Sequence, residues 1–244
     1  MKCDHEEERV AGASDRDKPG DDADCRARSG APPLRVVAWF VAVGSACYAF
    51  FLVVAFHGLA VDTWAQVHRQ LQIESVAASG LLVLDRLGLY NATIVAGNPG
   101  SIDLGGSLPN ALGTLSSVVQ VCAAVGVALA LTRGRLSPQR LATAATAEVL
   151  AFAVFGKVLS PQFLIWLVPL VPLVAGLGGL VATLLLPLAL LATQIELEGY
   201  SGLHIAGYSV VLLAIRNVLL LVLFGAVARE VLHGARTSEV ARLR

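Results

Sequence analysis

The sequence predicts an all-α membrane protein: a polytopic bundle of about six transmembrane helices plus one amphipathic helix at the membrane interface. Hydrophobic residues make up 56% of the 244 residues and charged residues only 15%, with a mean hydropathy of +0.70. A soluble domain carries about 25% charged residues. Half of the acidic residues lie within the first 24 positions, so the rest of the chain is more apolar than the average indicates.

Six apolar segments are candidates for membrane helices, because about 20 apolar residues in a helix cross a bilayer. The third is short and contains Glu148, and the fourth contains Pro169 and Pro172, which we expect to bend it. The six segments are 34–61, 108–131, 141–156, 163–175, 177–195 and 205–227.

The composition divides the chain into three regions. Residues 1–33 are rich in charged residues, Gly and Pro, so we expect a disordered hydrophilic tail. Residues 34–233 form the transmembrane domain, and residues 234–244 form a cytoplasmic tail. The net charge of zero argues against nucleic-acid binding. The four cysteines show no metal-ligand spacing, so we expect them unpaired, with no zinc or other cofactor.

The positive charges orient the predicted helices, because Lys and Arg accumulate on the cytoplasmic side. With six spans, both termini of this multi-pass plasma-membrane protein lie in the cytoplasm. Segments 61–107, 157–162 and 196–204 then face the exterior, where the only basic residues are Arg69, Arg86 and Lys157. The basic residues on the cytoplasmic side are Arg26, Arg28, Arg35, Arg133, Arg135, Arg140, Arg229, Arg236, Arg242 and Arg244.

The first external segment divides into two parts. Residues 66–89 have helical periodicity, which predicts an amphipathic helix lying on the membrane, either as a simple connector or as part of a site. Residues 91–106 are rich in Gly, Ser and Asn and have no helical period, so we expect a loop, either a lid or slack chain. The polar face of the predicted helix contains His68, Gln72, Ser75, Ser79 and Arg86.

Three polar residues fall at membrane depth: Glu148, Arg216 and Asn217. Charges in the membrane are costly and usually face a partner or a cavity. A Glu148–Arg216 ion pair between helices is one possibility, and a snorkelling Arg216 is the other.

The polar hexapeptide from Lys157 to Gln162 separates two apolar segments. A lysine followed by the helix-initiating pair Ser160-Pro161 puts a positive charge and helix N–H groups at one membrane face, where an anion such as a phosphate would bind. A lysine that merely snorkels at a helix end is the alternative.

Two segments resemble elements of glycosyltransferase family 87, the polyprenyl-phosphomannose-dependent mannosyltransferases of actinobacteria and their relatives. His68-Arg-Gln-Leu-Gln-Ile-Glu-Ser75 is similar to the family's H-x-R-x-L-Q-I-E-S element, although the spacer before the arginine is missing. Lys157-Val-Leu-Ser-Pro-Gln-Phe-Leu-Ile-Trp-Leu-Val-Pro169 resembles its K-x-x-S-P-Q-[YF]-x-x-W-x-x-P element. Thr193 to Glu196 and the Ala214-Ile-Arg-Asn segment are weaker matches to its last two helices.

The resemblance implies a GT-C type enzyme that transfers a hexose, with mannose as the expected sugar, from a lipid-linked sugar donor to a glycolipid or glycan acceptor outside the cell. Inverting transfer needs a carboxylate base near the acceptor hydroxyl and cations or N–H donors around the leaving phosphate. The residues expected to bind the donor phosphate or sugar are Lys157, Arg69, His68, Gln72, Ser160 and Gln162. Glu74 is a structural residue or an acid/base candidate, and Phe163 and Trp166 would border the polyprenyl groove in contact with membrane lipids.

The resemblance covers only the C-terminal half of the family. The family's catalytic acidic residue is expected in the missing N-terminal half, and we do not transfer this role to Asp62. Four interpretations therefore remain: an enzyme active alone, an enzyme that needs a separate chain supplying the N-terminal helices, a non-catalytic membrane protein descended from such enzymes, and a small transporter. The lack of an evident internal repeat speaks against the transporter.

Overall fold

The computed structural model describes residues 33–97, 101–132, 137–201 and 203–243. The described part of the protein is mostly helical. It forms two compact units, Met1–Val67 and His68–Arg244, which are treated separately below.

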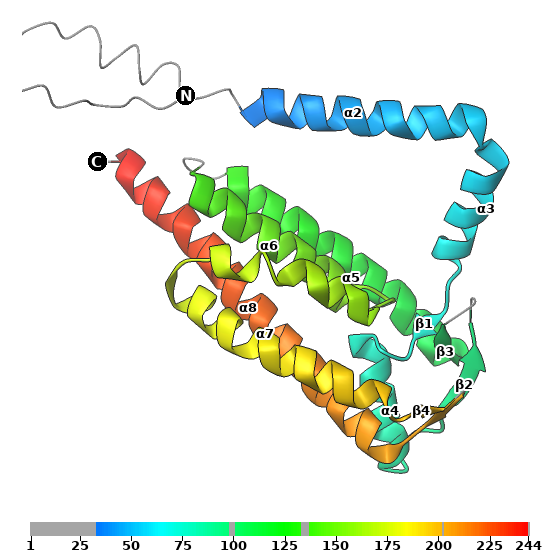
Figure 1. Cartoon of the computed structure of the whole chain (residues 1–244). Helices are drawn as coiled ribbons and strands as arrows, with labels where there is room; N and C mark the ends of the chain where they lie inside the picture. Colours follow the sequence, from blue (N-terminus) through cyan, green and yellow to red (C-terminus); the bar gives the residue numbers. More distant parts are fainter. Residues whose placement is uncertain (1–32, 98–100, 133–136, 202, 244) are drawn as a thin grey trace, which may run out of the picture. The chain divides into compact units, whose positions relative to one another are not determined.

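The first unit contains α2 (Pro33–Val54) and α3 (Phe56–Val67). The chain bends by 113° between these helices, at Ala55 (Figure 1). The structure therefore divides the span predicted over residues 34–61 into two helices. Beyond the bend, α3 contains His57 and Asp62, so it is less apolar than α2 and less suited to continue a membrane helix.

Within the described part of the chain, three helices are long and apolar enough to cross a membrane, or four if the bent pair in the first unit is one span. They are α5 (Ser107–Thr132), α7 (Gly176–Leu197) and the Gly207–Gly234 part of α8 (Gly207–Leu243). These helices match three of the six predicted segments closely. Helix α8 continues to Leu243, through the region expected to be a tail.

Helix α6 covers the predicted third segment, whereas the predicted fourth span forms a different structure. Helix α6 (Pro138–Phe155) is followed by two 3₁₀ helices, η1 (Pro161–Leu167) and η2 (Val171–Leu173). A bent α-helix was expected over residues 163–175, but prolines within and between η1 and η2 remove the backbone donors of a continuous helix. The Gln139 side chain at the start of α6 donates to the carbonyl of Leu173, so this segment returns to the end where α6 begins.

The long helices of the second unit alternate in direction. Arg140 at the start of α6 donates to the carbonyl of Ala130 near the end of α5. At the same end, the backbone N–H of Gly178 donates to Glu230 of α8 over 2.8 Å. We call this the Arg140 end of the bundle (Figure 1). The buried core between these helices consists mainly of Leu, Val and Ala.

Two small sheets cover the opposite end. Strands β1 (Leu71–Gln72), β3 (Ile102–Gly105) and β2 (Thr93–Ala96) form an antiparallel sheet in that order. Strands β4 (Tyr200–Ser201) and β5 (His204–Ile205) form a hairpin between α7 and α8. A second core of aliphatic residues lies here: Leu71, Ile73, Ala78, Leu81, Leu82, Leu104, Ile205, Val210 and Leu213.

Two predictions for residues 66–106 are wrong. The amphipathic helix expected over residues 66–89 is α4 (Val76–Arg86) alone, preceded by β1. Its expected polar face does not lie in water, because Gln72, Ser75 and Ser79 are buried. Ser75 caps α4 by accepting from the N–H of Ala78, so its hydroxyl is used inside the fold. Strands β2 and β3 lie where a loop was expected.

Candidate functional site

The two motif-like segments meet at the sheet-covered end of the bundle. The backbone N–H of Gln72 donates to the carbonyl of Lys157 over 3.0 Å, which joins β1 to the turn after α6. Burial and the nearby charge of Arg69 both lower the pKa of Lys157. Arg69 and Lys157 are both partly buried. The charge of Arg69 therefore acts on Lys157, and the Gln72–Lys157 hydrogen bond joins the two segments that carry these cations.

Arg69 also has an unsatisfied donor. Its Nε atom is buried and has no hydrogen-bond partner in the described part of the chain. A guanidinium donor makes its strongest hydrogen bonds to carboxylates and phosphates. This end of the molecule thus combines two positive charges with a donor available to an anion.

The other predicted donor-binding residues differ in position. His68 and Gln162 are exposed, and Ser160 is partly buried. Ser160 precedes η1, but its side chain makes no capping hydrogen bond. Because η1 is a 3₁₀ helix of seven residues, it does not provide the α-helix N-terminus that was expected to bind an anion.

Phe163 and Trp166 belong to an exposed aromatic cluster with Phe152 of α6. The ring centroids of Phe163 and Trp166 are 5.0 Å apart, and those of Phe152 and Phe163 are 5.6 Å apart. Trp166 is 50% exposed and Phe152 is 47% exposed. Such amphipathic and aromatic side chains are frequent where a protein meets the membrane interface. Phe152 precedes Lys157 in the chain, and Phe163 and Trp166 follow it.

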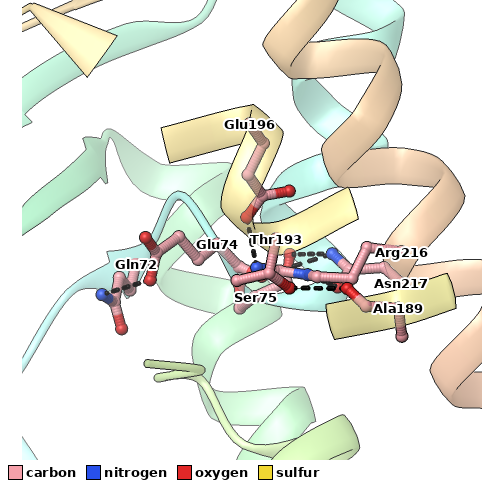
Figure 2. A network of polar contacts seen from close by, with 8 residues as sticks. All are labelled: Gln72, Glu74, Ser75, Ala189, Thr193, Glu196, Arg216 and Asn217. Carbon is pink, nitrogen blue, oxygen red and sulfur yellow. Dashed lines mark hydrogen bonds and ion pairs between the residues drawn. The ribbon is translucent and has the colours of Figure 1, made fainter. Parts of the chain in front are cut away.

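A buried polar network ties this end to the helices, and Figure 2 shows its members. Arg216 of α8 is completely buried and forms an ion pair with Glu196 of α7. Its other donors reach the backbone carbonyl of Glu74 and the side-chain oxygen of Asn217, the latter over 3.1 Å. Both earlier interpretations of Arg216 are wrong: its partner is Glu196 and not Glu148, and the side chain does not snorkel to water.

Asn217 holds the turn between β1 and α4. Its side-chain amide donates to the carbonyls of Glu74 and Ser75, over 3.3 and 3.2 Å. Together with Arg216, it satisfies backbone acceptors that would otherwise be costly to bury. The Gln72–Ser75 segment is therefore positioned by α8.

Glu74 points away from Arg216, toward β1 (Figure 2). Its carboxylate accepts a hydrogen bond of 3.1 Å from the Gln72 side-chain amide. Burial raises the pKa of Glu74 to about 7, although the charge of Arg216 acts in the opposite direction. Burial also raises the pKa of Tyr200, together with the negative charges of Glu196 and Glu74. The side chains of Glu74, Glu196 and Tyr200 are therefore close enough to interact electrostatically.

Sequence reasoning missed Glu196 and Tyr200 as members of this site. A signal was present for Glu196, because it ends one of the weaker matches, but its partner could not be read from the sequence. Among the described residues, no group of three or more His, Cys, Asp and Glu is arranged to hold a metal ion.

Comparison with known proteins leaves the chain without an assigned relative. No family model, curated protein or solved structure matches it.

Proposed function

We propose that this chain binds a polyprenyl-phosphate-linked hexose, such as mannose, and takes part in its transfer to a glycolipid or glycan hydroxyl. The observation that supports this most strongly is the proximity of Arg69 and Lys157, one from each motif-like segment. Two like charges held close together repel each other, and a bound phosphate relieves this repulsion. Cations around a leaving phosphate also stabilise the charge that develops during transfer.

The surroundings of the cation pair fit a lipid-borne phosphate. The rings of Phe152, Phe163 and Trp166 flank Lys157 in the chain, and the exposed Phe152 and Trp166 offer an apolar surface to a polyprenyl chain. A free phosphate would not need such a surface. This favours a donor that remains in the membrane while its phosphate reaches the cations.

The proposal places the site outside the cell. Arg140 and Arg229 belong to the opposite end of the bundle. A cytoplasmic position for this arginine-rich end follows the general bias of membrane proteins. The proposed protein is then a multi-pass protein of the plasma membrane with both termini in the cytoplasm.

Binding can be tested with the full chain in lipid nanodiscs and polyprenyl-phosphate-mannose as the probe. We expect Lys157→Gln and Arg69→Gln each to weaken binding about tenfold, which corresponds to the loss of ~1.4 kcal/mol. The matched control is Arg229→Gln, which removes an exposed positive charge at the other end. Unchanged affinity in both site variants would exclude the proposed phosphate site.

The transfer itself needs a carboxylate base, which the resemblance expects on helices preceding the first motif. The proposal therefore has two forms, a chain active alone and a chain that works with a separate protein supplying those helices. Membranes containing labelled donor, with the chain alone or with the product of a neighbouring gene, distinguish them. Labelled glycan in the first sample supports the first form, and labelled glycan only in the second supports the split enzyme.

A further inference from the structure

We infer that Gln72 and Glu74 form a sugar-hydroxyl subsite beside the two cations, so that this end of the bundle recognises the hexose of the donor as well as its phosphate. This inference rests on the proposed function and assigns recognition of the sugar hydroxyls to Gln72 and Glu74.

Gln72 is held in one position by three sets of contacts. Its backbone donates to Lys157, and strand β1 places it opposite Asp103 of β3. Its side-chain Nε2 donates to Glu74 over 3.1 Å. An ionised carboxylate accepts hydrogen bonds only, so in this form Glu74 faces the nitrogen of the Gln72 amide. The oxygen Oε1 must then point elsewhere.

That oxygen lacks a partner. Gln72 is only 7% exposed, and its Oε1 is buried without a hydrogen bond from any described residue. A buried acceptor left unpaired costs about 1–3 kcal/mol. A sugar hydroxyl can donate to this oxygen and can also accept a hydrogen bond in return. The adjoining Arg69 has the complementary defect, a buried Nε donor without an acceptor.

Glu74 supplies the second polar group of the subsite. Its backbone is fixed by Arg216 and Asn217, while its carboxyl group faces Gln72 (Figure 2). Glu74 is buried but keeps 7% of its surface exposed, whereas Glu196 keeps none, so Glu74 is the one of the two residues with any exposed surface. The charged and titratable groups facing it are Arg216 of α8, Glu196 of α7 and Tyr200 of β4.

The raised pKa of Glu74 is consistent with such a role. With a pKa of about 7, both the protonated and the ionised carboxyl are present near neutral pH. The protonated form can donate to a hydroxyl and the ionised form can accept from one.

The experiment compares two probes in the nanodiscs described above: polyprenyl phosphate and polyprenyl-phosphate-mannose. We expect the wild-type chain to bind the mannose-bearing lipid about tenfold more tightly. Gln72→Leu and Glu74→Gln should lose this preference but bind the sugar-free lipid within about twofold of wild type. The matched control is Gln194→Leu, which removes an exposed glutamine from α7. Thermal unfolding of each variant verifies its fold.

If Gln72→Leu does not fold, Gln72→Asn replaces it in the test. Asparagine keeps the amide group, but its side chain is one methylene shorter, so the amide no longer reaches the same position. A preference for the sugar that persists in the folded Gln72 and Glu74 variants overturns the subsite. Equal wild-type affinity for both lipids also overturns it and assigns the unpaired oxygen to a trapped water. In both cases the phosphate site stands if binding still depends on Lys157. Absence of binding to either lipid overturns the proposed function as well.

Discussion

Arg216 is the residue on which the buried network depends. Its guanidinium is completely buried and joins α8 to Glu196 of α7 and to the carbonyl of Glu74. Removing one partner of a buried ion pair leaves the other charge uncompensated. The network therefore works as a unit that holds the Gln72–Ser75 segment against two helices.

We predict that Arg216→Ala lowers the free energy of unfolding by about 3–5 kcal/mol, because Glu196 loses its counter-ion. Reversible unfolding in mixed detergent measures the change. The control Arg229→Ala removes an exposed arginine from the same helix and should change stability by no more than ~0.5 kcal/mol. Equal effects of the two substitutions would contradict the assignment.

Glu74 makes stability depend on pH. Its folded pKa of about 7 lies above the ordinary value of 4.5, so the folded protein binds more protons between these values than the unfolded chain. Stability contributed by this proton is therefore present below pH 4.5 and is lost as the pH rises through 7. We predict that Glu74→Gln, which cannot ionise, reduces the loss of unfolding temperature between pH 5 and pH 8. A pH profile parallel to that of wild type would refute this.

Lys157 reports on the charge of Arg69. Because burial and Arg69 both lower its pKa, we predict that Arg69→Gln raises the pKa of the Lys157 amine. The chain has only two other lysines, Lys2 and Lys18, so the amine can be followed by NMR after reductive methylation. Arg86→Gln is a control for removing an exposed arginine from α4. No change in the Lys157 titration would show that the two cations are not close.

Helices α7 and α8 meet through glycines at the start of α7. The N–H of Gly178 is satisfied by Glu230 of α8, and a Cβ at Gly178 would lie 2.5 Å from the carbonyl oxygen of Ala226. This close approach explains why a β-carbon is not tolerated at that position. It also places the first turn of α7 against the last membrane turns of α8.

We predict that Gly178→Ala destabilises the protein by about 1–3 kcal/mol, because the added methyl group forces the two helices apart. Gly126→Ala in α5 is the matched control, since a Cβ there meets no atom within 4 Å. Unfolding in detergent compares them. Equal stability of the two variants would show that α7 and α8 do not approach as closely as described.

The second unit has two chemically different ends. The Gln72, Lys157 and Arg216 contacts lie at one, and the Arg140 and Glu230 contacts lie at the other. The helices that connect the two ends alternate in direction. If α5 crosses the membrane, the two ends therefore lie on opposite sides of the bilayer. The proposed function requires the first end to face the exterior.

This orientation predicts a labelling pattern in intact cells. With the four native cysteines replaced by serine, Ser201→Cys in β4 should react with a membrane-impermeant maleimide added outside. Arg229→Cys should react only after permeabilisation. Both positions are exposed in the structure, so access to solvent within the protein does not distinguish them. The reverse pattern would place the site in the cytoplasm and contradict the proposed donor.

Apolar length alone predicted α5 and α7, and the start of α8, to within a few residues. In these segments the apolar composition favours the membrane, and a helix satisfies all backbone hydrogen bonds there, so both favour the same structure. The same reasoning failed over residues 163–175, where prolines change the type of helix, and over residues 91–106, where β2 and β3 pair without a strong local pattern. Short strands depend on their partners, which sequence periodicity does not reveal.

The amino-acid sequence by itself determined the membrane-like composition, the main apolar helices and the identity of the polar residues in the two motif-like segments. Only the tertiary structure decided that Gln72 bonds to Lys157, that Arg69 lies near Lys157 and that Arg216 pairs with Glu196. The physical reason is that backbone conformation depends mainly on nearby residues, whereas the partner of a buried polar group is chosen by the packing of elements distant in the chain.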